Sequence, residues 1–206
     1  MNAYDKIYLE DAAYNLAVMA DCGINNLGCP AREFWSRFLA SSIADRFSTG
    51  AVDVLVGHSG IELALMVMKE TGRDISGCSP IVSISSEEFW AGMNLAYYQW
   101  RTGMSFKELS RCGLDLPLVI SMFDPFHEAD PSVFFQAADG IIEADRESDA
   151  WLKEMRKACG LTQAELSVRS DVPIRLIRAY EQGTIKLANA EYHTVVSLKR
   201  ALGMVV

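Results

Sequence analysis

The chain has 206 residues, half of them hydrophobic, so it can bury the core of one large domain or two small ones. Its 19 basic and 27 acidic residues give a net charge of −8, which by itself does not indicate a nucleic-acid partner. No apolar run approaches the roughly 18 residues of a membrane span, and the first fifteen residues do not resemble a secretory signal. Five scattered cysteines without a C-x-x-C pair argue against a disulfide framework or a zinc site. We therefore expect a cytoplasmic protein without membrane segment, metal or cofactor.

The charge is distributed unevenly along the chain. Residues 151–206 hold nine Lys/Arg and five acidic residues, a net charge of +4, whereas residues 1–150 hold ten and 22, a net charge of −12. A cluster of basic residues is the electrostatic footprint of nucleic-acid binding. The split therefore favours a basic domain attached to an acidic body.

Helical periodicity predicts that residues 1–148 are mainly α-helical. Apolar residues follow a helical spacing over 5–21, and from Pro30 onward they recur at every fourth position. This second stripe consists of Trp35, Leu39, Ile43 and Phe47. The stretch from Glu87 to about Arg101 is apolar over much of its circumference, so we expect it at the centre of the first domain.

The most polar window of the chain, residues 143–149, is the best candidate for a linker. It predicts two domains, residues 1–148 and residues 149–206. Asp149 is well placed to cap the first helix of the second domain, with Leu152 and Met155 buried.

One segment raises a catalytic alternative. The apolar run Val52–Val56 precedes Gly57-His58-Ser59-Gly60, which is similar to the strand–turn–helix nucleophile elbow of α/β-hydrolases. The pattern lacks the last glycine, because Ile61 stands there, and Ser59 with Glu62 also forms the S-x-x-E pattern of a capping box. The sequence shows no alternation of strands and helices. A serine hydrolase using Ser59 remains a remote alternative, and no catalytic residue is assigned.

A second segment raises a metal alternative. Asp124, His127, Glu128 and Asp130 lie close together, but without the i, i+4 spacing of helical metal ligands. A turn that leads into the next helix, with Asp130 as N-cap before Pro131, explains these residues more simply.

The stretch Leu161–Gly183, LTQAELSVRSDVPIRLIRAYEQG, predicts two short helices joined by a tight turn. Thr162 and Glu165 form a capping box that opens the first helix. Residues 170–172 form the turn, Pro173 suits the first position of the second helix, and Gly183 is its stop signal.

This stretch resembles the helix-turn-helix of the Cro/C1-type, or XRE-like, DNA-binding regulators, and the resemblance extends over roughly residues 150–203. It implies a lambda-repressor-like helix-turn-helix domain at the C-terminal end of a mainly all-α chain. In this family the first motif helix lies across the phosphate backbone and the second, here Pro173–Gln182, enters the major groove. The resemblance places core residues at Leu161, Ala164, Leu166, Val172, Ile177 and Tyr180.

The DNA-contacting positions of the family also have counterparts here. Thr162, Gln163 and Lys186 match positions that contact phosphates, whereas Ile174, Arg175, Arg178 and Ala179 match positions that face the groove. Arg175 and Arg178 are the candidates for bidentate contacts with guanine, and Ile174 or Ala179 could meet a thymine methyl group. One departure is Asp171, which stands where the family commonly has glycine. The other is that no Gln or Asn is present to read adenine.

The resemblance implies double-stranded DNA as partner and a homodimer, because one module of this size reads few base pairs. We expect a repressor whose first domain dimerises or senses a protein or a small-molecule effector. The alternative is an antitoxin, whose first domain binds a protein toxin and whose C-terminal domain represses the operon.

Overall fold

The computed structural model describes residues 2–74, 86–187 and 190–204, and for residues 144–150 it describes the backbone alone. The chain divides into two compact units, residues 1–142 and 143–206. Every element of the described part is helical, which confirms the all-α prediction. No helix among these residues is long and apolar enough to cross a membrane.

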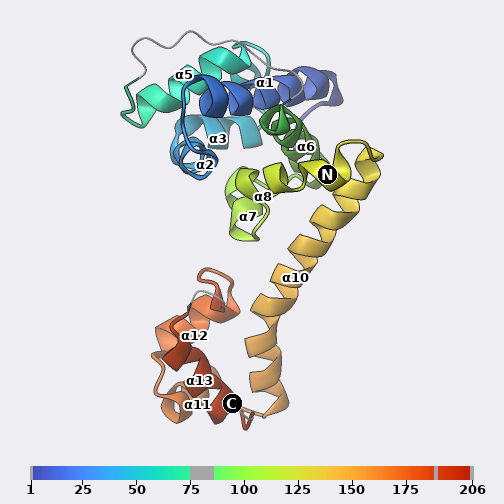
Figure 1. Cartoon of the computed structure of the whole chain (residues 1–206). Coiled ribbons are helices and arrows are strands. Elements are labelled where there is room, and N and C mark those ends of the chain that lie inside the picture. Colours follow the sequence, from blue (N-terminus) through green and yellow to red (C-terminus); the bar gives the residue numbers. More distant parts are fainter. Residues whose placement is uncertain (1, 75–85, 188–189, 205–206) are drawn as a thin grey trace. The chain divides into compact units, whose positions relative to one another are not determined.

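The first unit contains, in chain order, η1 (Lys6–Tyr8), α1 (Leu9–Asp21), η2 (Cys22–Asn26), α2 (Ala31–Ala40), α3 (Ser42–Ser48), α4 (Val52–Leu55), α5 (Gly60–Glu70), α6 (Glu87–Thr102), α7 (Phe106–Arg111), α8 (Leu116–Ser121), α9 (Phe123–Phe126) and the beginning of α10 (Pro131–Ala158). Helix α1 contacts both α5 and α6, as Figure 1 shows. The apolar stretch that we expected at the centre of the first domain forms α6. This helix packs mainly against α1.

Glycine allows α1 and α6 to approach each other closely. A Cβ atom on Gly92 of α6 would lie 2.8 Å from both the Cα of Ala17 and the carbonyl oxygen of Leu16. Both are backbone atoms of α1, which cannot move aside without shifting the helix. Gly92 is therefore required by packing.

One predicted helix is divided in the structure. The stripe from Pro30 is divided at Ser41, whose extended backbone (ψ 161°) separates α2 from α3. The hydroxyl of Ser41 donates to Phe38 O, and Glu70 accepts from both the amide and the hydroxyl of Ser42. These side-chain bonds offer the backbone an alternative to continued helix.

The prediction of a linker over residues 143–149 is also wrong, because these residues continue α10. The segment is polar but contains neither Gly nor Pro, so nothing in it terminates a helix. Asp149 accordingly lies inside α10 and is not an N-cap. The division between the compact units falls six residues before the boundary predicted at 148.

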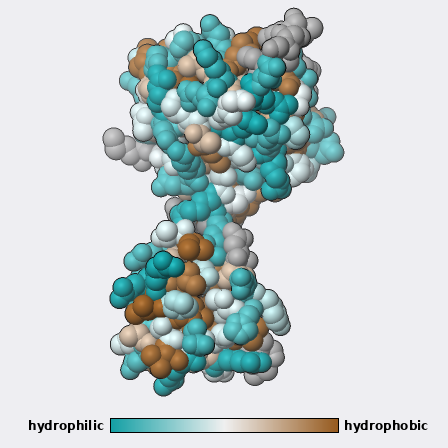
Figure 2. Space-filling view, turned by 90° about the vertical axis from the view of Figure 1, so that its left-hand side faces the viewer, coloured by the Kyte–Doolittle hydropathy of each residue, from teal (hydrophilic) through white to brown (hydrophobic). Residues whose placement is uncertain are grey.

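The second unit contains the rest of α10, α11 (Gln163–Ser170), α12 (Ile174–Glu181) and α13 (Tyr192–Ala201). Its core is separate from that of the first unit and is formed by Leu152, Leu161, Leu166, Val172, Ile177, Tyr180, Leu187, Leu198 and Leu202. Helix α11 contacts both α12 and α13. Some apolar side chains, including Val168 and Ile185, remain exposed, and apolar atoms are visible on this unit in Figure 2.

Replacing Gly92 by alanine tests the close crossing. We expect Gly92→Ala to destabilise the first unit by about 1–3 kcal/mol, because overpacking against backbone outweighs the gain in helix propensity. The measurement is urea unfolding followed by tryptophan fluorescence. The matched control is Gly140→Ala in α10, where an added Cβ meets nothing within 4 Å. It should be neutral or stabilising, and equal effects of the two substitutions would contradict the packing argument.

Candidate nucleic-acid interface

Helix α11 begins with the predicted capping box. The Oγ of Thr162 accepts from the Glu165 amide at 3.2 Å, and the Glu165 carboxylate accepts from the Thr162 amide at 2.7 Å. The hydrogen bond that Thr162 donates to this carboxylate, together with the nearby Arg169, holds the pKa of Glu165 below its usual value. Thr162 is exposed at this helix start, where the helix dipole favours an anion such as phosphate.

The turn between α11 and α12 has the geometry expected from its sequence. Asp171 adopts a left-handed conformation with φ 56°, the one non-glycine residue of the described chain with positive φ. Ser170 stabilises the turn, because its hydroxyl donates to Leu166 O and accepts from the Val172 amide. The Ser167 hydroxyl donates to Val172 O at 2.7 Å. The aspartate at the position of the usual glycine is thus accommodated.

Helix α12 is one residue shorter at each end than predicted. Pro173 is the N-cap, since its ψ of 132° is extended, and Gln182 is the C-cap. Gly183 follows with φ 64°, and the Thr184 amide donates to Ala179 O at 2.9 Å. Together with the bond from the Gly183 amide to Tyr180 O, this is the Schellman arrangement that ends helices.

The four residues predicted to face the groove lie along one side of α12. Arg175 and Arg178 are exposed, whereas Ile174 and Ala179 are half-buried. Neither guanidinium forms a hydrogen bond or ion pair with any other residue that the structure describes. The opposite side of the helix carries Ile177, which is fully buried. Two cations with unused donors therefore project from the helix.

Five of the six predicted core positions are buried, and the prediction for Ala164 is wrong. Ala164 is exposed, because α11 buries Leu166 and Ser170 and a residue two places before Leu166 points outward. The small buried residue of this helix is Ser170, which is 4% exposed.

A buried ion pair joins α12 to α10, and the sequence analysis did not predict it. Arg156 of α10 donates from Nε and Nη2 to the carboxylate of Glu181 at 2.6 and 2.9 Å. The Glu181 side chain is 2% exposed and that of Arg156 is 11% exposed. Nη1 of Arg156 also donates to Leu161 O, just before the capping box. One guanidinium thus joins the end of α10 to both motif helices.

Gln163 is the third member of this cluster. Its Nε2 donates to Glu181 Oε2 at 2.8 Å. The predicted phosphate donor is therefore held in a defined orientation, with a second N–H of the amide still able to donate. Lys186, the other predicted phosphate contact, is half-buried after Gly183.

The cluster sets the protonation of Glu181. Burial alone would raise the pKa of this carboxyl, but the hydrogen bonds from Arg156 and Gln163 outweigh it and hold the pKa below its usual value. The hydrogen bonds between Arg156 and Glu181 also stabilise the charged form of Arg156, and they raise the pKa of its guanidinium. The signal that could have revealed the pair is an acid next to the buried stripe of an amphipathic helix.

The Val52–Ser59 segment is not a nucleophile elbow in the described structure. Val52–Leu55 forms the short helix α4 in place of a strand. Ser59 caps α5, because its hydroxyl accepts from the Glu62 amide and donates to Glu62 Oε2 at 2.8 Å. The serine is thus engaged with a carboxylate rather than with a histidine base.

Residues 124–130, the segment of the metal alternative, form contacts with their neighbours in sequence. His127 stacks on Phe123 with ring centroids 4.3 Å apart, and its Nδ1 lies 3.0 Å from Phe123 O. Asp130 accepts from the Ser132 amide at the start of α10. Within the described residues no group of three or more His, Cys, Asp or Glu is arranged to hold a metal ion.

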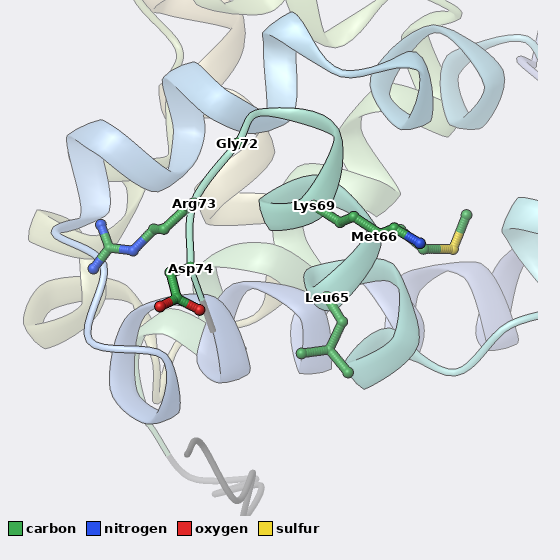
Figure 3. A pocket seen from close by; sticks show the side chains of 6 residues that line it. All are labelled: Leu65, Met66, Lys69, Gly72, Arg73 and Asp74. Carbon is green, nitrogen blue, oxygen red and sulfur yellow. The ribbon is translucent and has the colours of Figure 1, made fainter. Parts of the chain in front are cut away.

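A hollow of about 540 Å³ lies at the end of α5 and is lined by Leu65, Met66, Lys69, Gly72, Arg73 and Asp74. Figure 3 shows that the guanidinium of Arg73 is directed away from Lys69 and Met66. That guanidinium donates to Gly28 O at 3.0 Å and to Glu33 at 2.8 Å. The charged groups do not converge, so we assign this hollow no ligand.

The lowered pKa of Glu181 predicts how the second unit responds to acid. A carboxyl whose pKa is depressed by folding stabilises the fold above its unfolded pKa of about 4.3, and this contribution is lost as the pH falls through the folded pKa. We expect Glu181→Gln to lower stability at pH 7 by about 3–5 kcal/mol, because Arg156 is left buried without its counter-charge, and to weaken the dependence of stability on pH below about 4. The measurement is urea unfolding followed by circular dichroism over a pH series.

The control for this prediction is Glu154→Gln, which removes an exposed carboxylate from α10. It should leave the stability near that of the wild type. If Glu181→Gln retained the full acid sensitivity, the ion pair would not be its source.

Ser59→Ala distinguishes a cap from a nucleophile. Loss of the cap should lower the stability of the first unit by about 0.5–2 kcal/mol, whereas p-nitrophenyl acetate should be hydrolysed at the same background rate by both proteins. Ser36→Ala, at an exposed position within α2, should not destabilise. Ester hydrolysis that disappears in Ser59→Ala would instead establish a catalytic serine.

Residues 152–203 match the family model described as Helix-turn-helix. The comparisons with curated proteins and with solved structures give no significant match. The matched residues include α11, the turn, α12 and α13, together with the core that supports them. The C-terminal segment of the chain is therefore a Cro/C1-type helix-turn-helix domain, the DNA-binding domain of XRE-type transcription regulators.

Proposed function

We propose that the protein is a transcriptional repressor that binds an operator as a homodimer and reads the major groove with α12. The observation that carries the proposal is the exposed pair Arg175 and Arg178, which have no partner among the described residues, on a helix held from behind by Arg156 and Glu181. Arginine can donate two parallel hydrogen bonds to guanine O6 and N7. In this proposal the two arginines select the base pairs.

The start of α11 would position the domain on the backbone. Thr162 is exposed at the helix N-terminus, and the amide of Gln163 is held by Glu181. With Lys186 after α12, these residues would contact phosphates without reading sequence. Ile174 and Ala179 would add apolar contacts to thymine methyl groups beside the arginines.

Dimerisation follows from the size of the module. A two-fold axis would place two copies of α12 in successive major grooves about 34 Å apart. The complex should therefore contain two chains per operator, which sedimentation of the protein with its selected DNA can measure. Repression itself is tested by in vitro transcription from the promoter that carries the operator.

The DNA test uses fragments selected from the genome that encodes the protein, with binding measured by fluorescence anisotropy. Arg175→Ala and Arg178→Ala should each weaken binding to the selected site by about 1–3 kcal/mol and relax specificity at one position. The affinity should also fall steeply with salt, because each neutralised phosphate releases counterions.

The control for the arginine variants is Arg200→Ala, an exposed arginine in the last turn of α13. It should retain both affinity and specificity. If the full-length protein bound no genomic fragment at low salt, or if all three variants bound alike, the proposed role of α12 would be wrong.

The charge of the first unit favours a second function, that of an antitoxin. Residues 1–142 hold nine Lys/Arg and eighteen Asp/Glu, so this unit would attract a basic protein. The test is co-expression with the product of the adjacent reading frame, followed by size-exclusion chromatography. A stable complex with a toxic neighbour supports the antitoxin, and its absence leaves the repressor.

A further inference from the structure

The first unit has a second hollow, of about 320 Å³, between α1 and the segment that joins α4 to α5. It is lined by Asp11, Tyr14, Asn15, Val56, Gly57, His58 and Ser59. Its volume is at the lower end of the range for small-molecule sites. Its lining combines several polar groups with the exposed aromatic ring of Tyr14.

The walls of this hollow are fixed by the fold. Asn15 of α1 donates from Nδ2 to Leu55 O of α4 at 2.9 Å. Helix α5 begins directly against α1, since a Cβ on Gly60 would lie only 2.4 Å from Asn15 O and 2.6 Å from the Cβ of Val18. The capping box of Ser59 and Glu62 holds the remaining edge. The hollow is therefore preformed and needs no rearrangement to accept a ligand.

Asp11 supplies the carboxylate in the lining of this hollow, beside the imidazole of His58. Its carboxylate is exposed and forms no hydrogen bond or ion pair with another residue in the described part of the chain. The neighbouring carboxylates are occupied: Glu10 accepts from the Tyr97 hydroxyl, Glu62 from Ser59, and Asp53 pairs with Arg46. An anionic acceptor thus remains available at the rim.

Two side chains that line the hollow beside its polar groups, Tyr14 and Val56, offer apolar surface. Tyr14 is 49% exposed and Val56 is 37% exposed, which makes them two of the few large hydrophobic side chains that the first unit presents to solvent. The ring of Tyr14 is held by an edge-on contact with Phe89, with centroids 5.7 Å apart. A carboxylate beside a fixed aromatic ring attracts a cation through charge and through the ring quadrupole.

We infer that this hollow binds a small primary ammonium compound with an apolar body. The ammonium group would donate to Asp11 beside the Tyr14 ring, and the apolar body would cover Val56. An anion is disfavoured here, because the first unit carries eighteen acidic and nine basic residues. This site is independent of the proposed contacts with DNA, which lie in the other unit.

The test compares three probes that share one apolar body and differ in their polar group: 2-phenylethylammonium, 2-phenylethanol and 3-phenylpropionate. The full-length protein is titrated with each probe and followed by amide chemical shifts. Only the ammonium should bind saturably, with a Kd of about 1 mM for a ligand of this size, and the shifts should centre on residues 11–15 and 56–59.

Two variants test the assigned roles. Asp11→Asn should weaken binding of 2-phenylethylammonium about tenfold, because the amide keeps the size of the side chain and removes its charge. Tyr14→Ser should weaken binding by a similar factor, whereas Tyr14→Phe should retain it. The matched control is Asp124→Asn, which removes an exposed carboxylate of α9 outside the hollow and should change nothing.

Several results would overturn the inference. They are the absence of saturable binding of the ammonium up to about 50 mM, equal binding of the alcohol or the carboxylate, or unchanged binding in Asp11→Asn. Far-ultraviolet circular dichroism of each variant confirms that a loss of binding is not a loss of fold. Failure of this test leaves the DNA proposal untouched, because Arg175 and Arg178 are probed separately.

Discussion

The buried pair of Arg156 and Glu181 is the interaction on which the geometry of the helix-turn-helix depends. A helix of eight residues such as α12 is marginal by itself and takes its stability from packing. Its apolar contacts through Ile177 are non-directional, whereas two hydrogen bonds from one guanidinium define the position of Glu181. Removing one partner of such a pair typically costs about 3–5 kcal/mol, because the other charge remains buried.

The same pair explains why the candidate DNA-binding residues are organised. Arg156 also donates to Leu161 O, and Glu181 accepts from Gln163, so the start of α11 and the end of α12 share one charged centre. A phosphate donor and a base-reading helix must hold a fixed relation if both are to meet DNA in register. Replacing the pair by hydrophobic residues could retain stability but would release Gln163. We therefore attribute orientation, rather than net stability, to this pair.

Local signals in the sequence predicted the motif, and interactions between distant residues escaped prediction. The capping box of Thr162, the left-handed Asp171 and the stop at Gly183 each depend on backbone groups within a few residues. Arg156 and Glu181 are 25 residues apart, and no spacing rule connects them. The predictions of one helix through Ser41 and of a linker within α10 failed for a related reason. An apolar stripe does not reveal a competing side-chain bond, and a polar window without Gly or Pro does not end a helix.

The capping box shows how far one local pattern determines a role. Ser59 and Thr162 are both N-caps followed by glutamate, and in both the glutamate accepts from the cap amide. The difference lies in what surrounds them. Thr162 opens a helix in the basic segment 151–206 beside Gln163, whereas Ser59 lines a hollow with Asp11, which has no partner among the described residues. In our proposals the same cap belongs to an anion site in one unit and borders a cation site in the other, because the nearby charges set the sign of the ligand.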